Sequence, residues 1–116
     1  MNRRELVRKL VLSEISDDYE NVDQCILRHV AEVGAKCGLT IERSEIVDAL
    51  AELIDGGLAK AYILSGPKPT ELQSMPPLDV VEEYFKTYFY ITKKGMALHL
   101  SDDTWWPLDD EGKPRG

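Results

Sequence analysis

TIERSEIVDALAELIDGGLAKAYIL, residues 40–64, is the stretch that decides the fold of this chain. Apolar residues in its first part recur at helical spacing, which predicts a helix over 41–55 with one buried stripe. The stripe consists of Ile46, Val47, Leu50, Leu53 and Ile54. We expect the Thr40 hydroxyl to cap the start of this helix, and Glu42 to place negative charge in its first turn, where the helix dipole favours it.

The same stretch changes character at a pair of glycines. Gly56 and Gly57 offer the left-handed turn that ends a helix, and Leu58 can fold back onto the last turn. The residues that follow include Tyr62 and Ile63, which are typical of strands, and they predict a strand over 58–64. We therefore expect a buried helix followed at once by a strand.

Two more helices are predicted before this stretch. Apolar residues at helical spacing indicate a helix over 3–12 with a basic outer face, and a second helix over 21–36. The polar and acidic residues between them predict a connection, with a brief extended piece at Ile15. The residues expected to cap and close the second helix are Asn21 or Asp23 at its start and Gly34 or Gly38 at its end.

After residue 64 the pattern is interrupted by prolines, which lack the amide donor of a regular ladder. We expect a long wing over 65–87, containing a short helix near 78–84. The segment KTYFYIT, residues 86–92, is rich in β-formers and is predicted to pair antiparallel with the first strand. Thr92 should cap a final helix over 93–100. The residues of that helix expected to face inward are Met96, Ala97 and Leu100.

Length and composition limit the possible functions. A chain of 116 residues, 43% apolar and 30% charged, suits one globular domain. The formal net charge of −7 argues against a general nucleic-acid binder. No apolar run approaches the roughly 18–20 residues that span a bilayer, and the N-terminus does not resemble a signal peptide. We expect a cytoplasmic protein with no membrane partner.

Catalysis and metal binding have little support in the sequence. No nucleophile elbow, phosphate-binding glycine loop or paired histidine and carboxylate pattern is present, so we expect neither an enzyme nor a cofactor. Nothing points to a small-molecule ligand. The two cysteines are expected to be reduced and partly buried. A metal site would have to use Cys25, His29, Cys37 and His99, whose spacing matches no zinc pattern.

In this order of elements, the chain resembles the winged helix-turn-helix superfamily of transcription regulators, broadly of the PadR and MarR types. IERSEIVDALAELIDGGLA, residues 41–59, resembles a recognition helix with its Leu-x-x-Leu-x-x-x-Gly-Leu ending. YITKKGMALHL, residues 90–100, resembles a second wing strand that runs into a helix start. The resemblance implies an α+β, mainly helical domain over 1–100: a three-helix bundle with a two-stranded β-wing, followed by a C-terminal extension. The wing is longer and richer in proline than is usual for this group.

The outer face of the 41–55 helix is acidic. A helix that enters the major groove must cross two rows of phosphates, and its base contacts usually come from Arg, Lys, Asn, Gln or Ser. We therefore favour a non-enzymatic protein-interaction or dimerising module on a winged-helix scaffold, with a solvated acidic face. The acids expected to take part in such an interaction are Glu45, Asp48 and Glu52.

The alternative is a DNA-binding transcriptional regulator that uses its basic N-terminal helix and a wing lysine. The residues that would then contact DNA are Arg3, Arg4, Arg8, Arg43 and Lys68. A run of aromatic residues near the second strand resembles a platform for stacking bases, but we expect it to serve core and wing packing. This run consists of Tyr84, Phe85, Tyr88, Phe89 and Tyr90.

The tail over 101–116 is acidic and carries two adjacent tryptophans, Trp105 and Trp106. Each ring buries on the order of 200 Å² when it is covered, which favours docking over exposure. We predict that at least one tryptophan packs on the body of the domain or on a second subunit. The wing aromatics and the N-terminal helix are the expected receiving surfaces.

Overall fold

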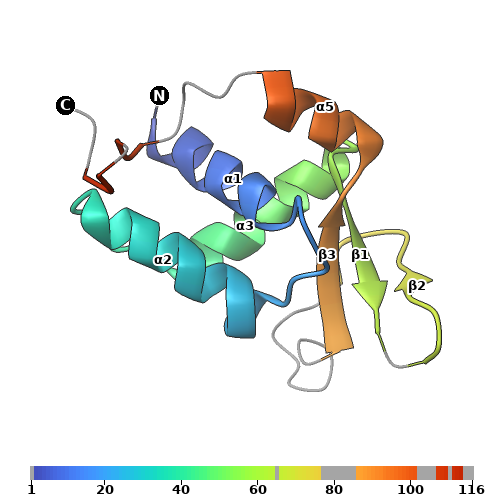
Figure 1. Ribbon diagram of the computed structural model, residues 1–116. Coiled ribbons are helices and arrows are strands. Elements are labelled where there is room, and N and C mark those ends of the chain that lie inside the picture. Colours follow the sequence, from blue (N-terminus) through green and yellow to red (C-terminus); the bar gives the residue numbers. More distant parts are fainter. Residues whose placement is uncertain (1, 65, 77–85, 102–106, 110, 114–116) are drawn as a thin grey trace.

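The computed structural model describes residues 2–64, 66–76, 86–101, 107–109 and 111–113. Its helices pack beside a small three-stranded antiparallel sheet, which confirms the α+β class (Figure 1). The elements are α1 (Arg3–Glu14), the one-turn π-helix η1 (Val22–Ile26), α2 (Leu27–Lys36), α3 (Arg43–Asp55), β1 (Ala59–Ile63), β2 (Thr70–Glu71), β3 (Thr87–Ile91) and α5 (Lys93–Ser101). The short helix predicted near 78–84 lies outside the described residues.

Helix α3 forms as its apolar stripe predicts. Ile46, Leu50 and Leu53 are almost completely buried at the centre of the hydrophobic core. The predicted cap is wrong, because Glu42 occupies the position before the helix and its N–H donates to the Glu45 carboxylate at 2.8 Å. This pairing leaves no role for the Thr40 hydroxyl at the cap.

The glycine pair ends α3 as predicted. Gly57 has a φ of +73°, the left-handed conformation that glycine adopts without steric cost. The Leu58 N–H then donates back to the Leu53 carbonyl at 2.8 Å, and the Leu58 side chain packs against the core. Strand β1 begins at the next residue.

The second helix differs from the single regular helix predicted over 21–36. It opens with the wider turn of η1, in which the Ile26 N–H donates to the Asn21 carbonyl five residues earlier. Asn21 is the cap, as predicted, because its side chain accepts from the N–H groups of Asp23 and Gln24. Its amide nitrogen also donates to the Thr87 carbonyl at 3.1 Å. One buried side chain therefore joins this helix to β3.

The sheet has the strand order β2-β1-β3. Pairing of β1 with β3 is confirmed, in the antiparallel register that sets Ala59 opposite Ile91 and Ile63 opposite Thr87. The prediction of only two strands is wrong, because β2 adds to the other edge of β1 with Thr70 opposite Ile63. Prolines lie on both sides of this two-residue strand but not within it, so its amides remain available.

A further extended contact lies between α1 and η1. The sequence predicts an extended segment at Ile15, but Ile15 instead ends α1 with its side chain buried. Its carbonyl accepts a hydrogen bond from the Ile91 N–H at 3.2 Å. The bridge forms instead at Glu20, which exchanges both backbone hydrogen bonds with Phe89, at 3.0 and 2.9 Å. The bridge pairs with the edge of β3 that faces away from β1, and the Phe89 side chain is fully buried in the core.

Helix α5 leaves β3 and returns towards α1 (Figure 1). Thr92 caps it as predicted, because its Oγ1 accepts from the Gly95 N–H at 3.0 Å. Met96 packs against the core, but the predicted inward orientation of Ala97 and Leu100 is wrong, since both are exposed. No helix in the described part of the chain has the length and apolar character needed to cross a bilayer.

Candidate interaction surface

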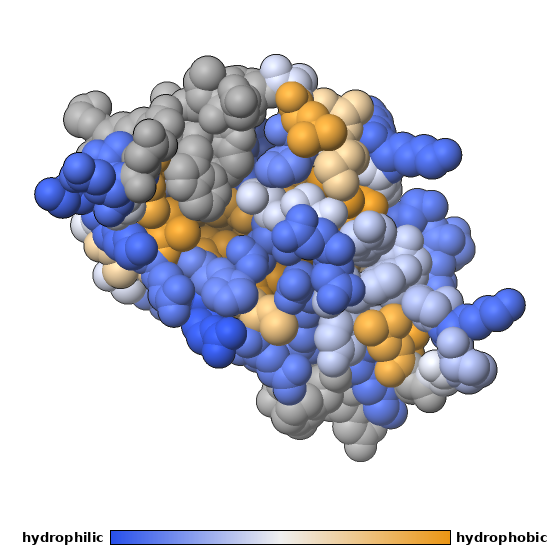
Figure 2. Space-filling view, in the orientation of Figure 1, coloured by the Kyte–Doolittle hydropathy of each residue, from blue (hydrophilic) through white to orange (hydrophobic). Residues whose placement is uncertain are grey.

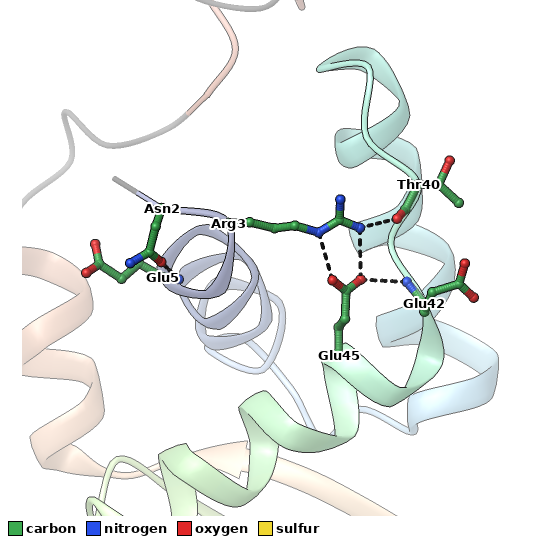
Figure 3. A network of polar contacts seen from close by, with 6 residues as sticks. All are labelled: Asn2, Arg3, Glu5, Thr40, Glu42 and Glu45. Carbon is green, nitrogen blue, oxygen red and sulfur yellow. Dashed lines mark hydrogen bonds and ion pairs between the residues drawn. The ribbon is translucent and has the colours of Figure 1, made fainter.

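The basic face of α1 lies against the acidic face of α3, and the two faces form ion pairs. Arg3 forms a two-pronged pair with Glu45, with Nε to Oε1 at 2.7 Å and Nη2 to Oε2 at 3.1 Å. The same Nη2 donates to the Thr40 carbonyl in the loop before α3 (Figure 3). Because Glu45 also accepts from the Glu42 N–H, the pair fixes the start of α3 against the start of α1.

A second cluster forms about two turns further along α3, at Glu52. Its Oε1 pairs with Arg4, and its Oε2 lies 3.5 Å from Nη1 of Arg8. This Oε2 is buried and receives no hydrogen bond. Glu52 therefore interacts with two arginines, and its interaction with Arg8 is electrostatic without a hydrogen bond.

A fourth arginine pairs on the other side of α3. Arg43 reaches Asp23 of η1, with Nε to Oδ1 at 2.7 Å and Nη2 to Oδ2 at 3.1 Å. This two-pronged geometry suits the planar guanidinium and ties the first residue of α3 to the helix before it. Arg43 is the only basic residue that the sequence offers within α3.

Electrostatics within the Arg3 pair follow from its geometry. The hydrogen bond from Arg3, with help from the Glu42 N–H, lowers the pKa of the Glu45 carboxyl below its usual value. The same hydrogen bond raises the pKa of the Arg3 guanidinium. Both charged forms are therefore favoured in the folded state, although both side chains remain partly in contact with water.

This shift predicts how stability depends on pH. Because the folded pKa of Glu45 is depressed, its contribution is present above the unfolded pKa of about 4.3 and is lost as the pH falls through the folded value. Glu45→Gln should therefore lower the free energy of unfolding at neutral pH, and the difference between variant and wild type should shrink in acid. Urea unfolding midpoints between about pH 2 and pH 6 would measure the effect.

A matched control for this experiment is Glu32→Gln. Glu32 is exposed on α2 and has no ion pair among the described residues. Its difference from the wild type should stay constant over the same pH range. If the stability difference between Glu45→Gln and the wild type grows as the pH falls, the assignment of the Arg3–Glu45 pair is contradicted.

Beside these ion pairs lies a hollow of about 590 Å³ between α1 and α3. Its walls carry both signs of charge around a small apolar floor. Its lining consists of Arg3, Arg4, Val7, Glu45, Asp48, Ala49, Ala51 and Glu52. Asp48 is exposed and has no ion pair within the described ranges. We call this feature the α1–α3 hollow.

The structure thus joins residues that the sequence analysis assigned to rival functions. The acids Glu45 and Glu52 were expected to face solvent, and Arg3, Arg4 and Arg8 were candidates for DNA contact, but they pair with one another. Lys68 lies apart from them, exposed in the connection between β1 and β2. Helical periodicity predicts each of these faces but carries no signal for which faces meet.

Three tyrosines meet on the outer face of the sheet, and of these only Tyr90 belongs to the aromatic run that the sequence singles out. The ring of Tyr19 stacks on Tyr90 with centroids 4.9 Å apart, and meets Tyr62 edge-on at 5.1 Å. Burial raises the pKa of the Tyr62 phenol. Alternation along β1 and β3 is sufficient to predict that Tyr62 and Tyr90 share one face. The position of Tyr19 beside them depends on the bridge between Glu20 and Phe89, which are far apart in the sequence. Tyr84 and Phe85 of the aromatic run, which was expected to serve core and wing packing, lie outside the described residues.

The described part of the tail lies near the end of α2. Leu108 is only 6% exposed, and Gly112 approaches the Lys36 side chain. Trp105 and Trp106 lie outside the described residues, so the docking of a tryptophan stays a prediction.

The cysteines and histidines do not converge. Within the residues that the structure describes, no group of three or more His, Cys, Asp or Glu side chains has the geometry to hold a metal ion. The ring of His29 pairs with Glu14. The Glu20 carboxylate raises the pKa of Cys25, which lowers the thiolate fraction of that free cysteine.

Compared with models of protein families, with curated proteins and with solved structures, the chain gives no match.

Proposed function

We propose that this chain is a non-enzymatic winged-helix module that associates with a second copy of itself, rather than an unaided reader of DNA. The order of elements supports the scaffold: α1, α2 and α3 precede an antiparallel pair of β1 and β3, and the Glu20 bridge lies at the outer edge of β3. The α1–α3 hollow is the surface that would make the contact.

The observation that carries this proposal is the pairing of the arginines. DNA affinity comes largely from cations that neutralise phosphates and release counterions. Arg3, Arg4 and Arg43 each already pair with a carboxylate, which offsets the positive charge that they would offer to phosphates. The acids would also remain beside the backbone and repel it. Both effects oppose a complex with DNA.

A second copy fits the hollow because its charges are self-complementary. Arg4, with 78% of its side chain exposed, and the exposed Asp48 line the same surface with opposite signs. A two-fold axis through this hollow brings the arginine of each copy towards the aspartate of the other. The small side chains of Ala49 and Ala51 allow close approach of the two helices.

The test combines solution mass with DNA binding. Light scattering over a range of concentrations should show a dimer that weakens as salt is added, because its contacts are charged. Glu45→Ala combined with Asp48→Ala should shift the chain towards monomer. The same double variant should raise affinity for random duplex DNA only in a non-specific, salt-sensitive manner, as fluorescence anisotropy would measure.

The matched control is Asp17→Ala combined with Asp18→Ala, which removes two exposed acids from the connection after α1. It changes the net charge equally and should leave the mass unaltered. A chain that stays monomeric at every concentration contradicts self-association. A sequence-specific DNA complex that the Glu45 and Asp48 variant abolishes contradicts the whole proposal, because those carboxylates would then contact bases.

A further inference from the structure

A second pocket, of about 350 Å³, lies where α1, the end of α3, the turn before β1 and α5 come together. Its size is at the lower end of the range for small-molecule sites. Its lining consists of Arg8, Lys9, Leu12, Leu53, Leu58, Leu98, His99 and Ser101. No residue of the α1–α3 hollow takes part in this lining.

The lining of this pocket combines an apolar body with cationic groups. Four leucines supply the apolar part, and Leu12 and Leu53 among them belong to the buried core, so this wall is held rigidly. The polar groups are Arg8, Lys9, His99 and Ser101, and no carboxylate is among the described residues that line the pocket. By contrast, three carboxylates line the α1–α3 hollow. In a chain with a net charge of −7, such a lining selects an anion with an apolar body.

Helix α5 presents apolar surface at the same place. Leu98 lines the pocket and is 53% exposed. Figure 2 shows apolar surface over α5, with further apolar patches elsewhere on the same face. A ligand in the pocket would cover part of the Leu98 side chain and remove that apolar area from water.

Arg8 has the donors to hold the anion. Its contact with Glu52 Oε2, at 3.5 Å, involves no hydrogen bond to that oxygen. A guanidinium carries five N–H donors, and a carboxylate can accept two of them side by side. The Arg8 side chain lines the pocket and is 40% exposed, so a ligand that enters the pocket can reach its guanidinium.

We infer that this pocket binds a small monocarboxylate with a hydrocarbon body, whose carboxylate pairs with Arg8 and whose chain packs on the four leucines. This site is separate from the surface proposed for self-association. Self-association can therefore fail in an experiment while binding of the carboxylate succeeds, and the reverse also holds.

Octanoate is the probe, and binding is followed by amide chemical shifts of the full chain. Shifts should concentrate in residues 8–12, 53–58 and 98–101. Octanol, which has the same chain length without the charge, should bind about tenfold more weakly, because it cannot form the charge-assisted hydrogen bonds. Arg8→Gln should weaken octanoate by about tenfold and leave octanol unchanged.

Two further variants complete the test. Arg28→Gln removes an exposed arginine from α2 and should leave octanoate affinity unchanged. Leu98→Asp places a negative charge at the exposed edge of the pocket and should abolish binding without disturbing the core. The inference is overturned if octanoate and octanol bind equally, if Arg8→Gln and Arg28→Gln behave alike, or if no shifts arise at millimolar octanoate.

Discussion

Leu50→Asp should leave this chain without a cooperative unfolding transition at room temperature. Leu50 is fully buried in α3, and its neighbours Ile46 and Leu53 are equally enclosed in the hydrophobic core. An aspartate there removes the packing of a leucine and places an unpaired carboxylate in an apolar environment. Together these effects cost about 4 kcal/mol or more, a large part of the 5–15 kcal/mol that stabilises a typical domain.

The matched control makes the same chemical change at the surface. Leu100→Asp alters α5 at a side chain that is 72% exposed, so stability should change by no more than about 0.5 kcal/mol. Circular dichroism during heating would follow both variants. If Leu50→Asp melts within a few degrees of the wild type, the position of α3 in the core is wrong.

The features that could be predicted from the sequence are those fixed by neighbours along the chain. The stripe of α3 and its glycine stop depend on residues within two turns, so their spacing was sufficient to locate them. The Asn21 cap and the Thr92 cap are local for the same reason. Pairing of β1 with β3 was also accessible, because two strongly β-forming runs flank a segment rich in prolines.

The features that could not be predicted depend on contacts between distant residues. Strand β2 has only two residues, too few for a pattern, and it exists because β1 offers an open edge. The bridge at Glu20 depends on β3, which lies about 70 residues further along the chain. In α5 the apolar residues lie all round the helix, so its buried side is decided by how its first turn docks, not by a stripe.

The candidate surface shows the same division. Periodicity correctly placed basic residues on one face of α1 and acidic residues on one face of α3. Tertiary packing decides whether those faces meet solvent, DNA or each other. Local sequence patterns do not reveal that packing. The pairing of Arg3 with Glu45, 42 residues apart, shows that the two faces meet each other, and it reduces the positive charge that DNA would meet.

Gly95→Ala is the second substitution with a large expected effect, because it attacks the docking of α5. A β-carbon at Gly95 would lie 2.1 Å from the Leu58 carbonyl oxygen and 2.8 Å from Cγ1 of Ile91. The carbonyl is fixed, since it accepts from the Thr92 N–H at 3.0 Å. Alanine normally stabilises a helix by about 1 kcal/mol relative to glycine, but this overlap with backbone should outweigh that gain.

We expect Gly95→Ala to lower the free energy of unfolding by about 2–3 kcal/mol, or the melting temperature by roughly 10 °C. Two other glycines provide a graded control. At Gly34 the new carbon would lie 2.5 Å from Cδ1 and 2.9 Å from Cγ1 of Ile41, so its close contacts are with a side chain and the loss should be smaller. At Gly66 it would meet nothing within 4 Å, so stability should not fall. If all three variants melt at the same temperature, α5 does not pack as closely against the Leu58 carbonyl as the structure shows.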